Sequence, residues 1–308
     1  MVALIAFFVS YLLTPFIAQV GKKQNFVDNP GYRKIHRDAI PNLGGIVIFF
    51  GFLLSILFII PIQGVVKGLL AGSVVILLLG VIDDIADLKP SYKFIIQLVA
   101  AFLVIGYHYD LINQFIKEEL GFLNISGYLL YPLLLFWIAG VTNSVNLIDG
   151  LDGLACGVSI ISLGTFFIMG LAIKEGFEIY NLLNIALFGS MLAFFRYNFY
   201  PAQIFLGDSG STFAGYTIAS IGSVWVISSG KVFFFLIPLL ILALPVGDTV
   251  FAILRRIKNK QPIFQGDQGH LHHRLLDRGI SHRNVVLILL GITFCCCLLA
   301  LFLFYSIY

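Results

Sequence analysis

The sequence carries little charge: only 11% of its 308 residues are Asp, Glu, Lys or Arg, whereas 59% are hydrophobic. A soluble globular domain has about 25% charged residues, so the composition excludes that class. The chain also lacks a cysteine framework. Residues 295–297 are three consecutive Cys in an apolar run, and Cys156 is alone in another. This pattern gives neither metal-ligand spacing nor a disulfide scaffold, so we interpret all four Cys as packing residues.

The N-terminal segment lacks the basic start and the small-residue cleavage site of a signal peptide. Residues 1–20 are apolar and are followed by Gly21-Lys22-Lys23, which predicts a first membrane helix with its N-terminus outside the cell. The chain shows no internal repeat, low-complexity linker or soluble segment. We therefore expect residues 1–308 to form a single integral-membrane domain.

Long apolar runs dominate the rest of the chain. A helix needs about 20 apolar residues to cross the hydrocarbon core of a bilayer. Runs of this kind lie near residues 1–20, 43–62, 65–82, 94–109, 128–142, 154–173, 181–196, 212–229, 232–253 and 285–306. The sequence predicts an all-α, polytopic transmembrane bundle of about ten spans.

The basic residues indicate the orientation of these spans. If residue 1 is outside, all but four of the 19 Lys and Arg fall in loops on the inner side. The four exceptions are Lys67, Lys117, Lys174 and Lys231. Because cytoplasmic loops carry an excess of Lys and Arg, we expect both termini outside and five loops in the cytoplasm.

Most of the remaining polar residues fall in the same inner loops. A charged side chain at the bilayer centre costs about 2.5–3.5 kcal/mol even on the lenient insertion scale. The Asp residues at the inner helix ends are therefore expected to surround a water-accessible cytoplasmic cleft. The first inner loop, residues 28–45, is rich in basic and turn residues. It is either an ordinary positive-inside loop or a basic lip that attracts phosphates.

Two carboxylates, Asp83 and Asp84, close the third expected span. Adjacent carboxylates are unfavourable neighbours unless a cation or a proton separates them, and they also oppose the helix dipole at a C-terminus.

The segment from Asn143 to Gly153 places Asn or Asp at every third position. These residues converge only if the helix tightens or breaks, which Gly150 and Gly153 permit. Their oxygens are hard ligands that suit Mg²⁺, Ca²⁺ or Mn²⁺.

Two further inner loops contain candidate residues. Asp208 lies between Gly207 and Ser209, where it either approaches a ligand or only caps the next helix. The last inner loop contains the sequence Gly269-His-Leu-His-His-Arg274. Its three His could hold Zn²⁺, but no Cys accompanies them, and phosphate contact by His and Arg is favoured. Acidic metal ligands and basic phosphate contacts on one membrane face are what phosphoryl transfer requires.

With these motifs in order on one face, the sequence resembles the polyprenyl-phosphate N-acetylhexosamine-1-phosphate transferase family. That family includes the enzymes that start the assembly of enterobacterial common antigen, O-antigen and teichoic acid. It also includes the translocase that makes the first lipid intermediate of peptidoglycan. The likeness extends from Asp28 to Arg274. The His-Leu-His-His-Arg pattern is similar to the N-acetylglucosamine-1-phosphate branch, whereas three consecutive His are typical of the translocase.

The resemblance implies a reaction, a cofactor and partners. The chain would transfer N-acetylglucosamine-1-phosphate, or a related N-acetylhexosamine-1-phosphate, from a UDP-sugar to undecaprenyl phosphate in the cell membrane and release UMP. It would use Mg²⁺, with Mn²⁺ as the alternative, and the family analogy suggests a homodimer. No nucleic-acid partner is indicated.

The resemblance also implies roles for particular residues. Asp208 would bind the metal with Asn146 as a second oxygen ligand, and Asp83 and Asp84 would act on the lipid phosphate. The remaining candidates would bind substrate: Lys93, Asn143, Asn146, Asp149, Asp152, Asn198, His270, His272, His273 and Arg274. The alternatives are a phospho-N-acetylmuramoyl-pentapeptide transferase and, in a different class, an ion-coupled transporter. A transporter would place its charges near the midplane and often contain repeats, neither of which fits this sequence.

Overall fold

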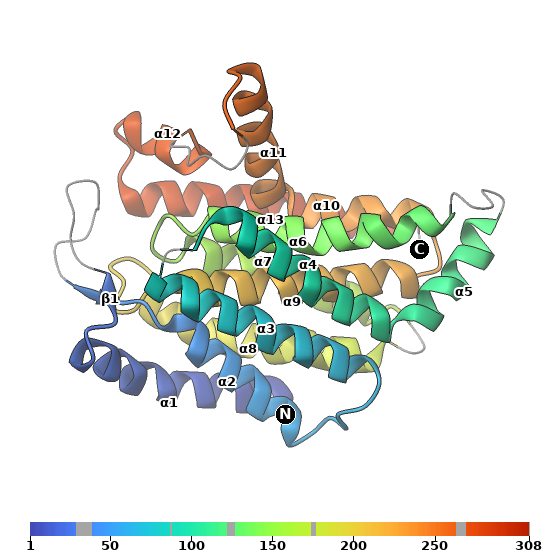
Figure 1. Cartoon of the computed structure of the whole chain (residues 1–308), viewed down its shortest axis with the longest axis horizontal. Coiled ribbons are helices and arrows are strands. Elements are labelled where there is room, and N and C mark those ends of the chain that lie inside the picture. Colours follow the sequence, from blue (N-terminus) through green and yellow to red (C-terminus); the bar gives the residue numbers. More distant parts are fainter. Residues whose placement is uncertain (29–38, 87, 122–126, 174–176, 263–268, 308) are drawn as a thin grey trace.

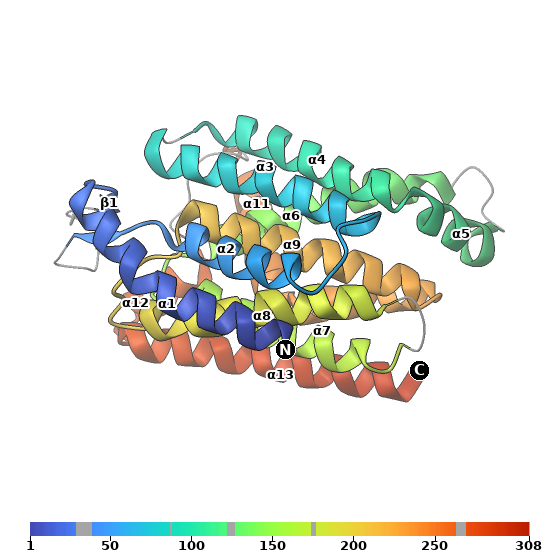
Figure 2. The ribbon, with the colours of Figure 1, turned by 90° about the horizontal axis from the view of Figure 1, so that it is seen from below.

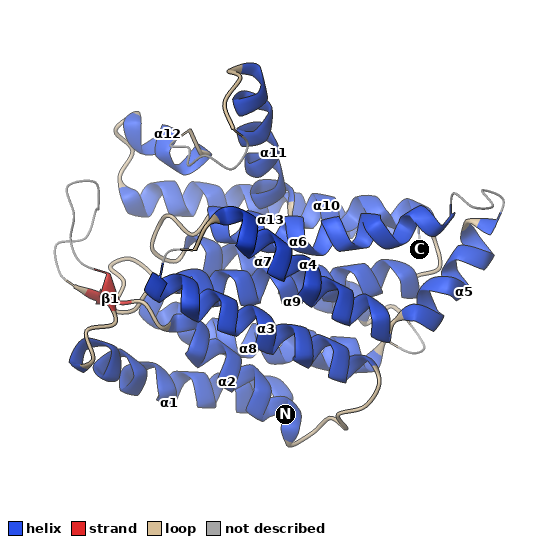
Figure 3. Ribbon diagram, viewed as in Figure 1, coloured by secondary structure: helices blue, strands red, loops and turns tan. Residues whose placement is uncertain are grey.

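A computed structural model describes residues 1–28, 39–86, 88–121, 127–173, 177–262 and 269–307. Helices make up almost all of this part of the chain (Figure 3). They are α1 (Val2–Lys23), α2 (Gly44–Leu57), α3 (Val65–Ala86), α4 (Pro90–Tyr107), α5 (Tyr109–Glu119), α6 (Leu130–Leu147), α7 (Leu154–Gly170), α8 (Glu178–Asn198), α9 (Gly207–Ser228), the 3₁₀ helix η2 (Val232–Phe235), α10 (Leu236–Ile241), α11 (Ala243–Lys258), α12 (Leu271–Asp277) and α13 (His282–Ile307). Among the described residues the one sheet is a short antiparallel pair, β1 (Val27–Asp28) with β2 (Ile40–Pro41).

The axes of most of the long helices are roughly parallel or antiparallel to one another (Figure 1), as expected for a membrane bundle. Six of them are long and apolar enough to cross a bilayer: α1, α3, α4, α6, α8 and α13. A seventh span is possible if η2, α10 and the bent helix α11 are taken together, and α2 and α7 are shorter apolar helices. The all-α, polytopic prediction is confirmed. Each of the ten expected runs overlaps at least one helix, but six or seven spans, not ten, meet the length and hydropathy of a membrane crossing among the described residues.

Helix α9 is the centre of the bundle. It contacts α2, α3, α6, α7 and α8, and Figure 2 shows it between α3 and α4 on one side and α13 on the other. Apart from Asp208 and Ser228 at its two ends, every residue of α9 is buried. Its many Gly, Ser, Thr and Ala residues allow neighbouring backbones to approach closely. Several of its hydroxyls bond within the helix, such as that of Ser223, which donates to the Ala219 carbonyl at 2.8 Å.

The beginning of α9 is held at one end of the bundle by α2 and α3. The backbone N–H groups of Gly44 and Gly45, at the start of α2, donate to the carbonyls of Phe205 and Leu206. On α3, a Cβ atom added to Gly80 would lie 2.2 Å from the Cα of Ser209. A larger residue at position 80 would therefore push α3 away from the residues around Asp208.

The expected span over residues 232–253 does not form one straight helix. It bends by 86° between α10 and α11, and α11 projects away from the other long helices in Figure 1. The sequence offers a physical cause, because Pro245 has no N–H to donate to the carbonyl of Ile241 four residues earlier. The bend brings Asp248 on α11 toward the end of the bundle that carries α12.

Candidate active site

Two carboxylates and one ammonium group meet where α3, α4 and α9 converge. Lys93 on α4 forms an ion pair with Asp83 at the end of α3, and its Nζ lies 3.4 Å from Oδ2 of Asp208. The carboxyl groups of Asp83 and Asp208 are also within hydrogen-bonding reach of each other. Carboxylates this close repel unless a proton or a cation lies between them. The ammonium group of Lys93 supplies that positive charge.

Asp84 has a different environment from Asp83, although the two are adjacent. Its Oδ1 accepts the backbone N–H of Asp208 at 2.8 Å, and its Oδ2 accepts that of Ser209 at 3.2 Å. The side-chain amide of Asn42 donates to the same carboxylate at 2.9 Å. These N–H groups lie in the first turn of α9, where no earlier helical carbonyl can accept them. The helix dipole also favours a negative charge at this end. Asp84 therefore caps α9 from a different helix.

Gly207 permits this arrangement, because its φ of +75° is one that other residues rarely adopt. A Cβ atom there would lie 2.5 Å from Oδ1 of Asn42. The chain thus turns into α9 with Asp208 facing Lys93. Only 37% of the Asp208 side chain remains exposed, which leaves one face of its carboxylate open to a ligand.

Asn146 joins the same group from the last turn of α6. Its Nδ2 donates to Oδ1 of Asp208 at 2.7 Å and to the hydroxyl of Ser211 at 3.0 Å. In this arrangement the amide nitrogen faces Asp208. The structure thus brings together Asp83, Lys93, Asn146 and Asp208, four of the residues that the sequence singles out.

This donor set fits a magnesium ion better than a zinc ion. Among the described residues, no three His, Cys, Asp or Glu side chains gather closely enough to hold a metal by themselves. A zinc site normally needs three or four such protein ligands. Mg²⁺ instead keeps several waters and is bound by one or two carboxylates together with substrate phosphates. Asp208 and its neighbour Asp83 can supply those carboxylates.

The segment between α6 and α7 breaks as the glycines predict. Helix α6 ends at Leu147, and Gly153 has a φ of +80° just before α7 begins. Asp149 lies in this turn. Its desolvation within the protein, followed by the charges of Asp208 and Asp84, raises the pKa of its carboxyl well above the usual range. Asn143 lies one turn earlier on α6 and is half-buried.

Asp152 is fixed by two later segments of the chain. Its Oδ2 accepts the backbone N–H of Ala202 at 3.0 Å, and its own N–H donates to Nε2 of His282, also at 3.0 Å. Asn198 is buried and its amide donates to the carbonyl of Ile204 at 3.0 Å. In this structure Asn198 therefore stabilises the loop between α8 and α9. The sequence predicted only a contact with substrate for this residue.

The histidine segment at residues 269–274, called the His loop below, is hydrogen-bonded to α11 through Asp248. Nδ1 of His270 lies 2.7 Å from Oδ2 of Asp248, whose other oxygen accepts the N–H of Leu271 at 2.9 Å. A carboxylate in this position fixes the orientation of the imidazole and makes its bonded nitrogen the donor. The rings of His270 and His272 are parallel, with centroids 5.9 Å apart.

His272 connects this loop to the Asp149 segment. A Cβ atom at Gly150 would lie 2.4 Å from its Nε2, so the imidazole packs directly on that backbone. This nitrogen is buried and has no hydrogen-bond partner among the described residues. Burial, followed by the neighbouring His273 and His270, lowers the pKa of His272 to about 4. His273 packs beside it with ring centroids 4.2 Å apart, and Arg274 is exposed on α12.

Three residues of this region were not predicted from the sequence: Asn42, Asp248 and His282. Each acts through a contact between segments far apart in the chain. Asp248 had one local signal, a lone acidic residue within an apolar run, and His282 had none. The expected basic lip around Arg33, Lys34 and Arg37 lies outside the described residues.

Comparison with known proteins gives consistent matches. The profile of glycosyl transferase family 4 matches residues 66–226. A probable undecaprenyl-phosphate N-acetylglucosaminyl 1-phosphate transferase from Bacillus subtilis is 40% identical over 298 residues, covering 94% of this chain and 82% of the relative.

More distant relatives carry two kinds of name. A decaprenyl-phosphate N-acetylglucosaminephosphotransferase from Mycobacterium leprae is 28% identical over 316 residues, or 94% of this chain and 79% of the relative. A phospho-N-acetylmuramoyl-pentapeptide-transferase from Limosilactobacillus reuteri is 32% identical over 238 residues, or 70% of this chain and 71% of the relative.

Proposed function

The chain belongs to glycosyl transferase family 4, and we propose that it transfers N-acetylglucosamine-1-phosphate from a UDP-sugar to undecaprenyl phosphate. The observation that carries this proposal is the meeting of Asp83, Lys93 and Asp208 at one end of a membrane bundle. The likeness to the Bacillus subtilis relative over 94% of the chain supports the choice of donor and acceptor.

Both substrates are anionic and repel each other, so positive charge in the site is needed to bring them together. Asp208, with Asn146 beside it, would hold Mg²⁺, or Mn²⁺ in its place. Such an ion, when bound, neutralises phosphate charge and stabilises the charge that develops on the transferred phosphoryl group. Asn146 would have to turn its amide oxygen toward the ion, an exchange of N and O positions within one side chain.

The reaction is a direct displacement in this proposal. An oxygen of the acceptor phosphate attacks the β-phosphorus of the UDP-sugar, and the bond from that phosphorus to the bridging oxygen breaks to release UMP. A phosphate monoester has a second pKa of about 6 and is mostly a dianion at neutral pH. Asp83 therefore need not act as a strong base, and with Lys93 it would position the acceptor phosphate.

The other candidate residues would bind the donor. Asp149 and Asp152, with Asn143 on the preceding turn, would hold the nucleotide. The histidines of the loop and Arg274 would contact the diphosphate or the sugar. Asn198 would contribute indirectly, since its amide already stabilises the loop before Asp208.

The proposal includes an orientation in the membrane. The ten helical runs would form ten spans, with both termini outside and the Asp83–Asp208 end facing the cytoplasm. UDP-sugars are cytoplasmic, and the excess of Lys and Arg in the loops at this end has the expected sign. We retain the homodimer as part of the proposal on family analogy alone.

The second candidate function is transfer of phospho-N-acetylmuramoyl-pentapeptide. It is favoured by the relative from Limosilactobacillus reuteri, which matches a smaller share of this chain. A panel of UDP-sugars decides between the two. Purified protein with undecaprenyl phosphate and Mg²⁺ should form an extractable lipid product from UDP-N-acetylglucosamine. Product only from UDP-N-acetylgalactosamine would change the sugar, and product only from the muramoyl-pentapeptide nucleotide would favour the alternative. No product from any of them would contradict the proposed transfer.

A further inference from the structure

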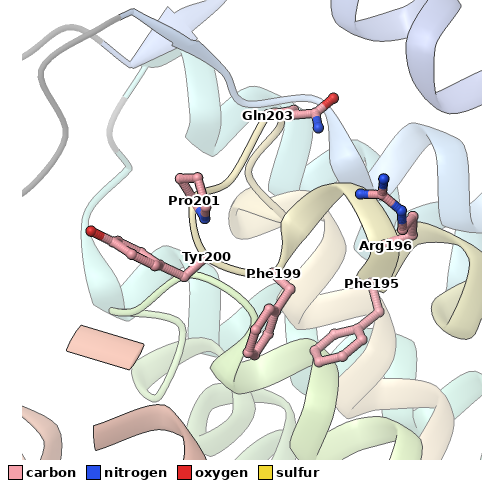
Figure 4. Close-up of a pocket in the computed structure, with 6 residues that line it drawn as sticks. All are labelled: Phe195, Arg196, Phe199, Tyr200, Pro201 and Gln203. Carbon is pink, nitrogen blue, oxygen red and sulfur yellow. The ribbon is translucent and has the colours of Figure 1, made fainter. Parts of the chain in front are cut away.

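A cavity of about 340 Å³ lies at the end of α8 and in the loop that follows it. It is lined by Phe195, Arg196, Phe199, Tyr200, Pro201 and Gln203. Figure 4 shows the rings of Phe195 and Phe199 side by side, with Pro201 and Gln203 across from them and Arg196 at one side. Its volume is at the lower end of the range for ligand pockets, about 300–1,000 Å³.

This cavity is distinct from the reaction centre. None of the six lining residues is acidic or a histidine, and none belongs to the group formed by Asp83, Lys93, Asn146 and Asp208. The only charge in its wall is the guanidinium of Arg196. A ligand that matches the cavity therefore carries a negative group together with an apolar portion for the aromatic rings.

The position of Arg196 on α8 relates the cavity to the membrane. Leu192, one helical turn earlier on the same face, is 41% exposed. In a membrane-spanning helix an exposed leucine faces acyl chains, so the next turn toward the helix end reaches the head groups. Tyr200 follows and is 42% exposed. An apolar residue followed by arginine and tyrosine is the order expected across the bilayer interface.

We propose that this cavity binds the head group of an anionic membrane phospholipid such as phosphatidylglycerol. Arg196 contacts the phosphate, the rings of Phe195 and Phe199 receive the glycerol and upper acyl chain, and Gln203 hydrogen-bonds the head group. Basic pockets at the cytoplasmic ends of membrane helices are suited to anionic lipids. The assignment is independent of which sugar nucleotide the protein uses.

The cavity is also connected to the residues around the reaction centre through contacts with Asp152. Ala202, between Pro201 and Gln203 in the cavity wall, donates its N–H to the Asp152 carboxylate. The ring of Tyr200 packs on His282 with centroids 4.6 Å apart, and His282 accepts the N–H of Asp152. A lipid that orders the loop over residues 199–203 therefore stabilises both contacts of Asp152.

Native mass spectrometry of the purified full-length protein tests the proposal. The probes are phosphatidylglycerol, phosphatidylcholine, undecaprenyl phosphate and inorganic phosphate. Wild-type protein should retain phosphatidylglycerol in preference to phosphatidylcholine. Arg196→Gln should lower that retention about fivefold, the worth of one basic side chain at an anionic membrane surface. Arg196→Lys should lower it less, and Arg278→Gln, which removes an exposed charge just after α12, should leave it unchanged.

A photoactivatable phosphatidylglycerol gives a second readout on the wild-type protein, in case Arg196→Gln does not fold. Cross-links should map to residues 195–203. Equal retention by wild type and Arg196→Gln, or cross-links that avoid this segment, would overturn the proposal. Competition by undecaprenyl phosphate at equal concentration would assign the cavity to the acceptor instead, and displacement by millimolar inorganic phosphate would reject a lipid site.

Discussion

The carboxylate of Asp84 accepts the backbone N–H of Asp208 at 2.8 Å, 124 positions later in the chain. This contact gives the two adjacent carboxylates of α3 separate tasks. Asp84 fixes the backbone from which Asp208 projects, whereas Asp83 faces Lys93 and the Asp208 side chain. Asp84 thus orders the start of α9, whereas Asp83 is buried beside Lys93 and Asp208 and also accepts the backbone N–H of Leu88 at 2.8 Å.

The first prediction separates these tasks by the same substitution at each position. Asp84→Asn replaces one acceptor oxygen by an NH₂ group that faces backbone donors. Leaving such donors unpaired costs about 1–3 kcal/mol, so the unfolding temperature should fall. Asp83→Asn can keep its amide oxygen on the Leu88 N–H, so its unfolding temperature should fall less than that of Asp84→Asn, while transfer should still fall by at least tenfold.

Each variant is the control for the other, with both thermal unfolding and transfer measured in the same detergent. If Asp84→Asn unfolds at the wild-type temperature while Asp83→Asn is destabilised, the assignment of the two residues is reversed.

The second prediction concerns Asp248, which orients His270 from α11. Asp248→Asn removes the charge from this bond and one acceptor for the start of α12. A charge-assisted hydrogen bond is worth about 1.5–3 kcal/mol, so the KM for the UDP-sugar should rise about tenfold. The KM for undecaprenyl phosphate should stay within about twofold. Asp277→Asn, an exposed carboxylate at the end of the same short helix, is the matched control. A rise in both KM values would mean that Asp248 only supports folding.

The third prediction is a pH dependence of stability at His272. The imidazole stays neutral in the folded protein down to pH 4 or so, but in the unfolded chain it takes up a proton below about 6.5. Acidification through this window therefore favours unfolding, by about 2 kcal/mol between pH 7 and pH 5. The fall in unfolding temperature over that range should be smaller in His272→Gln. An identical fall in both proteins would show that His272 is not protected from protonation.

The helical runs of this fold could be predicted because hydrophobicity reports directly on burial in a bilayer. The bend at α10–α11 could not, since Pro245 lies in an apolar run and prolines are tolerated within membrane helices. The central position of α9 was also not predicted. Its Gly, Ser and Thr residues make it less apolar than most of the other long helices, although it is the most buried.

The sequence predicted those site residues that are polar and lie within or beside an apolar run. Asp83, Asn146 and Asp208 stand out in this way. The role of Asn198 was incomplete, because its bond to the Ile204 carbonyl depends on how the loop folds back. The contacts of Asn42 with Asp84 and of His282 with Asp152 join segments 42 and 130 positions apart. No periodicity in one sequence encodes such contacts.

The fourth prediction is topological and tests the shared cytoplasmic site. Cys introduced at exposed positions beside the site, in Ser91→Cys and Asp277→Cys, should react with a membrane-impermeant maleimide only from the cytoplasmic side. Glu118→Cys on α5 should react only from outside. Labelling of Ser91→Cys and Asp277→Cys from opposite sides would contradict a single cleft.

The most direct test of the account follows the β-phosphorus of the donor. Purified protein is incubated with undecaprenyl phosphate, Mg²⁺ and UDP-N-acetylglucosamine carrying ³²P at the β position, with Asp208→Asn as the inactive control. Transfer of the sugar with its phosphate predicts that the label enters the lipid fraction and that UMP is released in equal amount. Asp208→Asn should lower this rate by orders of magnitude while remaining folded. Label that stays in the aqueous phase as UDP, while the sugar enters the lipid, would contradict sugar-1-phosphate transfer.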